Sequence, residues 1–314
     1  MTTLTLPVAA LLAVAAVALD RIFGEPRRAH PLVAFGRLAG RLEARLNTGR
    51  HGRPVGLLAW LAAVAPPVLV AAWLVRVLPL PLAAALHVAL LWFALGARSL
   101  REHIAPIGAA LAQRNLAEAR RLTSRIVSRD TASADAAALA RAAVESALEN
   151  GNDAIFGALF WFAVAGGPGA LAFRLANTLD AMWGYRTSRF LRFGWAAARI
   201  DDVLNWIPAR LTAASYALLG DTSSALRCWR DQARRWDSPN AGPVMAAGAG
   251  SLNVLVGGAA VYHGVLEARP QLGVGVSPDA VHVDAALRLV ERATALWLAV
   301  LLALALLVAA VGHA

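Results

Sequence analysis

Carboxyl and amide side chains gather in VESALENGND, residues 144–153, directly before a long apolar run. Glu145 and Glu149 are four residues apart, so both lie on one face if the segment is helical. Carboxylates grouped in this way can bind a divalent cation, or they can orient and deprotonate an amine. The alternatives are solvated surface acids and, for Asp153, the N-cap of a following helix. The stretch is therefore a candidate site whose chemistry depends on its surroundings.

A helix has to position these acids. Residues 133–149 are rich in alanine, begin with serine and are followed by Asn150 and Gly151, which predicts a helix that stops there. In the last turn of such a helix, the dipole disfavours the negative charges of Glu145 and Glu149 by about 0.3 to 1 kcal/mol each. We therefore expect that removing either charge leaves folding unharmed or slightly improved, while activity falls.

Two later segments carry polar stripes on otherwise apolar sequence. In AFRLANTLDAM (172–182) and AARIDDVLNWI (197–207), polar groups recur every three residues, which places each set on one helical face. Such groups usually face a water-filled cavity and are functional candidates, whereas pairing of Arg with Asp inside each helix is the alternative. The sets are Arg174, Asn177 and Asp180 in the first segment, and Arg199, Asp202 and Asn205 in the second.

The composition is that of a membrane protein. Of the 314 residues, 58% are hydrophobic and 16% are charged, which is too apolar for an ordinary soluble domain. All 30 basic residues are Arg, so the formal net charge of +10 persists near neutral pH and points to anionic partners or anionic lipid. The absence of Lys excludes a Schiff base or a P-loop lysine. The single Cys228 excludes an internal disulfide and is expected to be a buried thiol.

Four apolar runs have about the length of a membrane span. They are residues 4–19, 55–75, 80–97 and 294–312. The segments 21–54 and 98–153 hold eight arginines each, which by the positive-inside rule puts both in the cytoplasm and the N-terminus outside.

Two further runs, 154–176 and 203–220, are interpreted as re-entrant. The GGPG at 166–169 should break the first run, and Pro208 with Arg210 should interrupt the second. Residues 177–293 would then stay cytoplasmic. In the alternative topology, both runs cross the membrane.

The predicted fold class is thus an all-α polytopic integral membrane protein with about four firm spans plus re-entrant or interfacial helices. It forms one membrane-embedded domain in the inner cell membrane. We expect three spans in 1–97, a mainly cytoplasmic catalytic region in 98–293 and a last span in 294–314.

Three segments read as loops with unusual chemistry. Residues 19–37 contain His30, and residues 184–199 carry four arginines. In residues 237–258, Gly248 and Gly250 could let backbone N–H groups approach a phosphate, although close helix packing explains these glycines equally well.

Several long stretches together resemble the CobD/CbiB proteins of cobalamin biosynthesis. They are LDRIFGEPRRAHPLVAFGR, IVSRDTASAD, VESALENGNDAIFGALFWFAVAGGPGALAFRLANTLDAMWGYR, RFGWAAARIDDVLNWIPARL and SPNAGPVMAAGAG. The resemblance covers about residues 17–262, and SLNVLVGGAAVYHG (251–264) departs from the family's usual pattern. It implies ATP-dependent joining of aminopropanol, generally as its O-phosphate, to a propionate carboxyl of adenosylcobyric acid. The product would be adenosylcobinamide or its phosphate.

Such a ligase implies ATP, Mg²⁺, an acyl phosphate intermediate, arginines for phosphate and a base for the amine. Within the resemblance, the expected catalytic residues are Glu149, Asp153 and Asp202, and the expected metal ligands are Glu145, Asp201 and Asp202. The expected substrate- or phosphate-binding residues are Arg186, Arg189, Arg199, Asn177, Asp180, His30 and Asn240. Because adjacent helical side chains diverge by about 100°, Asp201 and Asp202 should not be equivalent.

The implied partners are adenosylcobyric acid, aminopropanol or its phosphate, membrane lipid and other corrinoid-pathway enzymes, with no nucleic acid. The active site is expected on the cytoplasmic side. Two other classes stay open on the sequence. A transporter of an anionic solute or corrinoid would use the broken helices as a path, and a scaffold for other corrinoid enzymes would have no turnover of its own.

Overall fold

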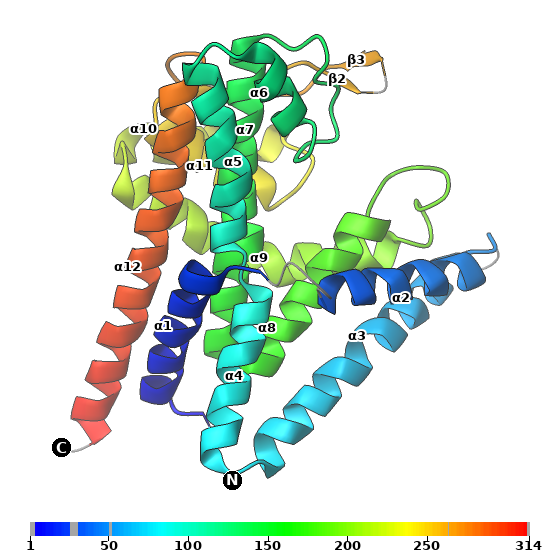
Figure 1. The fold of residues 1–314 in the computed structure, drawn as a ribbon, viewed down its shortest axis with the longest axis vertical. Helices are drawn as coiled ribbons and strands as arrows, with labels where there is room; N and C mark the ends of the chain where they lie inside the picture. Colours follow the sequence, from blue (N-terminus) through cyan, green and yellow to red (C-terminus); the bar gives the residue numbers. More distant parts are fainter. Residues whose placement is uncertain (1–3, 26–30, 50–51, 263, 313–314) are drawn as a thin grey trace. The chain divides into compact units, whose positions relative to one another are not determined.

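The computed structural model describes residues 4–25, 31–49, 52–262 and 264–312. The chain divides into two compact units, which are treated separately. Unit 1 comprises Met1–Gly96, Gly157–Asn205 and Leu298–Ala314, and unit 2 comprises Ala97–Phe156 and Trp206–Trp297. Helices make up most of both units (Figure 1), which confirms the predicted all-α class.

Unit 1 is built around one central helix. Its elements are α1 (Leu6–Phe23), α2 (Pro31–Leu46), α3 (Gly52–Val77), α4 (Leu80–Ala94), α8 (Gly157–Trp183), the first part of α9 (Trp195–Leu219) and the last part of α12 (Ala280–Gly312). α8 packs against α1, α2, α3 and α4. Small buried residues such as Ala59 and Ala63 of α3 share a core with Leu171, Leu175 and Leu179 of α8, and small side chains allow helices to approach closely.

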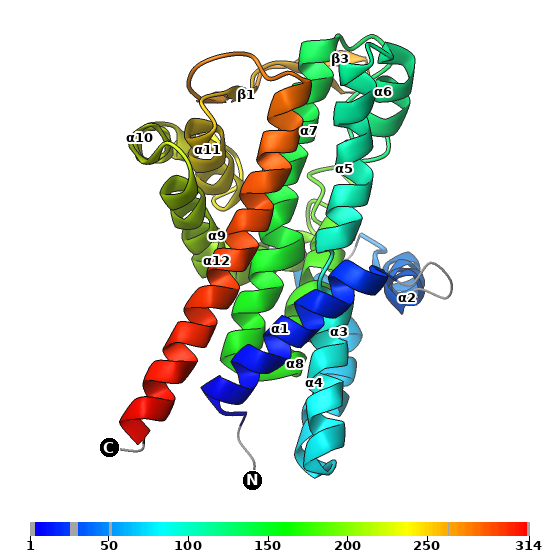
Figure 2. The ribbon, with the colours of Figure 1, turned by 60° about the vertical axis from the view of Figure 1, so that its left-hand side comes forward.

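Unit 2 combines helices with two small sheets. Its helical elements are α5 (Ala97–Ala112), α6 (Leu116–Thr123), α7 (Ala136–Gly151), the π-helical turn η1 (Asn152–Phe156), α10 (Thr222–Gln232), the 3-10 turn η2 (Ala233–Arg235), α11 (Ala241–Ser251), the rest of α9 and the first part of α12. α5, α6 and α7 lie side by side (Figure 2), and α11 packs against α10 and α7.

The strands of unit 2 were not predicted. β1 (Leu255–Gly257) pairs antiparallel with β4 (Gln271–Gly273), and β2 (Ala260–Tyr262) pairs antiparallel with β3 (Val265–Glu267). Part of this region lies in 251–264, where the sequence departs from the family pattern.

Five helices in the described residues are long and apolar enough to cross a membrane. They are Leu6–Phe23, Gly52–Val77, Leu80–Ala112, Ala136–Trp183 and Ala280–Val311. Four of them overlap the predicted spans almost completely, and the fifth contains the run 154–176. Whether that run crosses or re-enters stays a prediction.

The GGPG sequence does break α8, as predicted. Ala165 and Gly166 have non-helical backbone angles, and Gly166 takes a positive φ of 65°. A Cβ at Gly166 would lie 2.6 Å from the His87 ring, so glycine is needed there. The Nδ1 atom of His87 accepts a hydrogen bond of 2.8 Å from the Gly167 N–H, which satisfies a backbone group freed by the break.

Three local predictions were wrong. The helix containing Glu145 and Glu149 does not stop at Asn150 and Gly151, because α7 leads directly into η1 and α8. The Asn150 amide bonds back to Ser146 O at 2.9 Å. A Cβ at Gly151 would lie 2.5 Å from the Tyr216 hydroxyl, so this glycine serves packing and is no stop signal.

The other two errors concern α9 and α11. Pro208 lies inside a continuous α9, so it does not interrupt the 203–220 run. Half of the predicted 237–258 loop is helix α11, in which a Cβ at Gly248 would lie 2.7 Å from the Leu148 side chain. A Cβ at Gly250 would lie 2.8 Å from Ser224 O. Close helix packing therefore explains both glycines.

The contact between α3 and residue 193 gives a test of the unit 1 packing. A Cβ at Gly56 would lie 1.9 Å from the Phe193 carbonyl oxygen, whereas a Cβ at Gly40 of α2 meets nothing within 4 Å. We expect Gly56→Ala to lower the stability by about 1 to 3 kcal/mol, because overpacking forces backbone shifts. Gly40→Ala should be neutral or stabilising by up to about 1 kcal/mol. Thermal unfolding in one detergent compares them, and equal melting temperatures would contradict the described packing.

Candidate functional site

The polar stripes of α8 and α9 meet in unit 1. We call Asn177, Asp180, Asp201, Asp202 and Asn205 the α8–α9 polar cluster. The Asn177 amide donates to Asp201 Oδ1 at 3.3 Å, and the Asn205 amide donates to Asp201 Oδ2 at 3.0 Å. Asp201 is thus held from two helices by neutral donors. Asn205, expected on the face of Asp202, is instead buried beside Asp201.

Asp202 has different surroundings. Its Oδ2 lies 3.5 Å from Nη1 of Arg199, and its charge repels that of Asp180. Burial raises the pKa of Asp202, while the guanidinium groups of Arg199 and Arg186 act in the opposite direction. A carboxylate with a raised pKa is better suited to accept a proton near neutral pH. The expected difference between the two adjacent acids therefore has a structural basis.

The end of α8 and the residue that follows it pack closely against Asp180. Gly184 N–H donates to the Asp180 carbonyl at 2.7 Å, and a Cβ at Gly184 would lie 2.0 Å from Asp180 Oδ1. Glycine at this position therefore leaves room for the carboxylate. The same short connection leads to Arg186, which is exposed.

One more segment of unit 1 approaches helix α8 of the cluster. Arg174 of α8 lies 3.6 Å from Glu25, which follows α1 in the chain. His30, an expected substrate ligand, lies outside the described residues.

Arg189 is held by a buried acid. Its Nε and Nη2 donate to the Glu43 carboxylate of α2 at 2.9 and 2.6 Å, and Asn47 donates to Glu43 and to the Arg189 carbonyl. Hydrogen bonding from Arg189 lowers the pKa of Glu43. Arg189 thus has a fixed carboxylate partner on α2. The structure favours a positioning role for it over the expected phosphate contact.

A second cluster lies in unit 2 around Glu145. This side chain is only 3% exposed. Arg129 donates to Glu145 Oε2, Nη2 of Arg269 lies 3.3 Å from both carboxylate oxygens, and Gly257 N–H donates at 2.7 Å. We call Arg129, Glu145 and Arg269 the Glu145 clamp. The expected metal ligand Glu145 is therefore engaged by two guanidinium groups.

The clamp fixes the sheet region of unit 2. Arg269 also donates to Gly258 O at 3.1 Å and lies over Trp236 at 5.3 Å. Next to Arg129, Asp130 accepts from Gly264 N–H at 2.7 Å and donates its own N–H to Val261 O at 2.7 Å. The stretch IVSRDTASAD thus holds the β2–β3 hairpin.

Sequence reasoning assigned no role to Arg129 or Arg269. Arg129 lay within a stretch quoted for the resemblance, so an ion pair with one of the buried acids could have been proposed. Arg269 is 124 residues from Glu145 and lies outside the resemblance, so no signal pointed to it.

The remaining acids of this stretch lie on α7 and on the turn η1 that follows it. Glu149 feels repulsion from Glu145 and attraction from Arg129 and Arg269. Asp153 lies in η1 and accepts from the Asn152 amide at 2.9 Å, while Asn152 Oδ1 accepts from the Thr212 hydroxyl at 3.1 Å. Single π-helical turns inside helices are frequent at functional sites, which keeps Asp153 a candidate.

Asn240 has an anchoring contact. It is buried, and its Oδ1 accepts from Nη1 of Arg210 at 3.0 Å. Arg210 stacks on Trp206 at 4.2 Å. A substrate contact by Asn240 stays a prediction.

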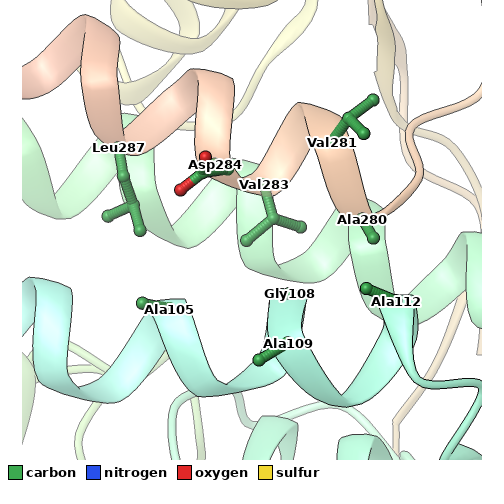
Figure 3. Close-up of a pocket in the computed structure, with 9 residues that line it drawn as sticks. All are labelled: Ala105, Gly108, Ala109, Ala112, Ala280, Val281, Val283, Asp284 and Leu287. Atoms are coloured by element: carbon green, nitrogen blue, oxygen red, sulfur yellow. The ribbon is translucent and has the colours of Figure 1, made fainter.

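A cavity of about 320 Å³ lies elsewhere in unit 2, between α5 and α12 (Figure 3). Val283 and Leu287 point from α12 toward the small side chains of α5. Its one acid, Asp284, accepts from Arg288. No expected site residue lines this cavity, so it does not mark the candidate site.

The structure thus gathers the expected residues into two groups. Asn177, Asp180, Asp201, Asp202 and Arg199 come together in unit 1, and Glu145 and Glu149 in unit 2. Within the described residues, no group of three His, Cys, Asp or Glu side chains is arranged to hold a metal ion. The expected metal set of Glu145, Asp201 and Asp202 draws on both units and stays a prediction.

Comparison with known proteins bears on both clusters. The family model described as "CobD/Cbib protein" matches residues 13–290. The chain belongs to the CobD/CbiB family. Proteins named "Cobalamin biosynthesis protein CobD" are similar over most of their length. That of Stutzerimonas stutzeri is 60% identical over 92% of this chain and 95% of its own. That of Chromobacterium violaceum is 52% identical over 94% and 96%.

A more distant relative matches over a similar share of both chains. The Mycobacterium tuberculosis protein of the same name is 40% identical over 90% of this chain and 92% of its own. No solved structure shows a significant match. The CobD/CbiB match includes every residue of the α8–α9 polar cluster and of the Glu145 clamp.

The clamp reverses one expectation from the sequence. We expected that removing the Glu145 charge would not harm folding, because the helix was predicted to end near Glu149. The helix instead continues into η1 and α8. Glu145→Gln leaves the partly buried Arg129 and Arg269 without their carboxylate, so we expect a loss of about 3 to 5 kcal/mol in stability. Glu102→Gln, which removes the exposed pair with Arg98, should change stability by at most about 1 kcal/mol. Thermal unfolding in detergent measures both, and an unchanged Glu145→Gln protein would show that the clamp does not stabilise unit 2.

Proposed function

We propose that this chain acts in cobalamin biosynthesis as an ATP-dependent amide ligase. It joins aminopropanol, or its O-phosphate, to a propionate carboxyl of adenosylcobyric acid and forms adenosylcobinamide or its phosphate. Membership of the CobD/CbiB family and the names of its relatives support the pathway. The substrates and the ligase chemistry follow from the resemblance.

The observation that carries the proposal is the α8–α9 polar cluster. Three carboxylates lie on two otherwise apolar helices, with the exposed Arg186 and Arg199 close to Asp202. Acids, amides and arginines in one place can hold an anionic substrate, accept a proton and exclude competing orientations. A purely structural helix pair has no need of Asp202 and Asp180 in mutual repulsion.

The α8–α9 polar cluster is compatible with a magnesium ion that is held jointly by protein carboxylates and substrate phosphates. Mg²⁺ is usually held by one or two protein carboxylates together with substrate phosphates, and Asp180 with Asp202 offers such a pair. A closed three-ligand protein site does not occur in the described residues. When bound, Mg-ATP would supply the activation that makes a carboxylate reactive toward an amine.

The chain's own side chains then have separate tasks. Arg186 and Arg199 would bind phosphate or propionate, because guanidinium groups pair with such oxygens in two-pronged geometry. If Asp202 does not hold the metal, its carboxylate, whose pKa is raised by burial, would take a proton from the incoming ammonium. Asp201, bracketed by Asn177 and Asn205, would position this region. Glu149 and Asp153 of unit 2 remain candidates for handling the amine.

We place the reaction on the cytoplasmic side of the inner cell membrane, because the arginine-rich segments favour that side. Contact with other enzymes that act on corrinoids would fit this placement. A second candidate function is transport of an anionic solute or corrinoid. The break of α8 at Gly166 favours it, since broken helices line substrate paths in transporters.

One assay separates these classes. The purified protein is incubated with adenosylcobyric acid, aminopropanol phosphate and Mg-ATP, and the corrinoid is analysed by mass spectrometry. Ligation adds the mass of the amine less one water. An unchanged corrinoid together with uptake into proteoliposomes would support the transporter instead. If both readouts are negative, the scaffold hypothesis gains support.

The two adjacent acids should respond differently to substitution. We expect Asp202→Asn to reduce ligation at least tenfold, or about 1.4 kcal/mol in barrier, with a nearly unchanged melting temperature. Asp201→Asn should lower the melting temperature, because an amide replaces a carboxylate that accepts from two amides. Asp231→Asn, an exposed acid on α10, is the matched control and should change neither. Wild-type turnover for Asp202→Asn at limiting magnesium would remove Asp202 from the site.

A further inference from the structure

Helix α2 presents a row of arginines on its outer face. Arg37, Arg41 and Arg45 recur every four residues, so they lie along one side of the helix, and all are exposed. The opposite side, which includes Phe35 and Ala39, is buried in the core of unit 1.

The row lacks compensating charge within the described part of the chain. The one acid of α2, Glu43, is buried on the other face and is bound by Arg189 and Asn47. Among the described residues, no carboxylate pairs with Arg37, Arg41 or Arg45. Like charges four residues apart on a helix repel one another. An anionic partner outside the chain would offset this repulsion.

The connection between α8 and α9 extends the same surface. Arg189 fastens it to α2 through Glu43. On the other side, a Cβ at Gly52 would lie 2.6 Å from the Arg192 side chain, and a Cβ at Gly56 would lie 1.9 Å from Phe193 O. The start of α3 therefore packs directly on this connection.

Apolar and aromatic side chains are exposed on this connection. Tyr185, Leu191 and Trp195 are 55%, 57% and 41% exposed. Arg53, at the start of α3, lies 5.2 Å from the centre of the Trp195 ring. Leu38 is exposed on α2 itself. Tyr and Trp mixed with Arg and single apolar groups are typical of the membrane–water interface.

Three features together identify the partner. The surface is strongly positive, it exposes interfacial aromatic residues, and it continues into the apolar helix Gly52–Val77. Figure 1 shows α2 crossing α3 instead of running beside it, as a helix lying along a membrane surface would. We propose that α2 and residues 184–195 form a docking surface for the headgroups of anionic phospholipids. Residues 184–195 also contain Arg186, which the proposed ligase activity assigns to substrate, but the argument for the docking surface rests on Arg37, Arg41 and Arg45 and on the exposed Tyr185, Leu191 and Trp195.

Native mass spectrometry of the full chain from mixed phosphatidylglycerol and phosphatidylcholine tests this surface. We expect the wild-type protein to retain phosphatidylglycerol selectively. The variant Arg37→Gln/Arg41→Gln/Arg45→Gln should retain at least tenfold less. The control variant Arg125→Gln/Arg234→Gln/Arg235→Gln removes the same charge from exposed positions of unit 2 and should behave as wild type. Equal retention by both variants would overturn the proposal.

A second measurement needs no change to α2. The protein is placed in nanodiscs, and the fluorescence of Trp195 is obtained as the difference between the wild-type protein and Trp195→Phe. Phosphatidylglycerol brominated near the headgroup should quench the fluorescence of Trp195. Absence of that quenching would overturn the proposal even if the triple variant failed to fold. The last measurement is a competition between inorganic phosphate and the bound lipid. If phosphate displaced the lipid at equal concentration, the surface would be a site for free phosphate and not for a membrane.

Discussion

The buried carboxylate of Glu145 is the contact on which most of unit 2 depends. It lies on α7 and is compensated by guanidinium groups from two other segments and by one backbone N–H from β1. An unpaired charge at this depth would cost several kcal/mol, so the surrounding segments can adopt few other arrangements. The positions of both small sheets follow from it, because Arg269 and the residues next to Arg129 also bind the strand region.

Buried acids are also compensated in unit 1, but by different partners. Asp201 is satisfied by two amides, and Glu43 by an arginine and an amide. Both acids join segments that are distant in the sequence, and neither leaves a carboxylate oxygen facing only apolar atoms. Asp202 differs because its neighbours include another acid as well as exposed arginines. This contrast is the reason why Asp202 is proposed to act in the chemistry, whereas Asp201 and Glu43 are expected to hold the fold together.

Much of the fold was predictable because apolar runs and helix-breaking residues act locally. The four firm spans and the break at GGPG follow from such local physics, as does the helical spacing that brought Asp180 and Asp202 forward as candidates. Two of the three local errors share one cause. Gly151, Gly248 and Gly250 look like stop or loop signals, but their lack of a side chain is required by neighbours far away in the sequence. The partners of Glu145 and Arg189 were missed for the same reason, since only the folded chain brings them together.

The unequal sequence separations within the Glu145 clamp also bear on how unit 2 forms. Arg129 is 16 residues from Glu145, whereas Arg269 is 124 residues away. Loop-closure entropy favours the nearer contact, so the pair with Arg129 can form while the later part of the chain is still being synthesised. Glu145 would then be neutralised early, as the apolar helix behind it enters the bilayer. The second guanidinium can arrive only after α9, α10 and α11 have been made, which places closure of the strand region among the last steps of folding.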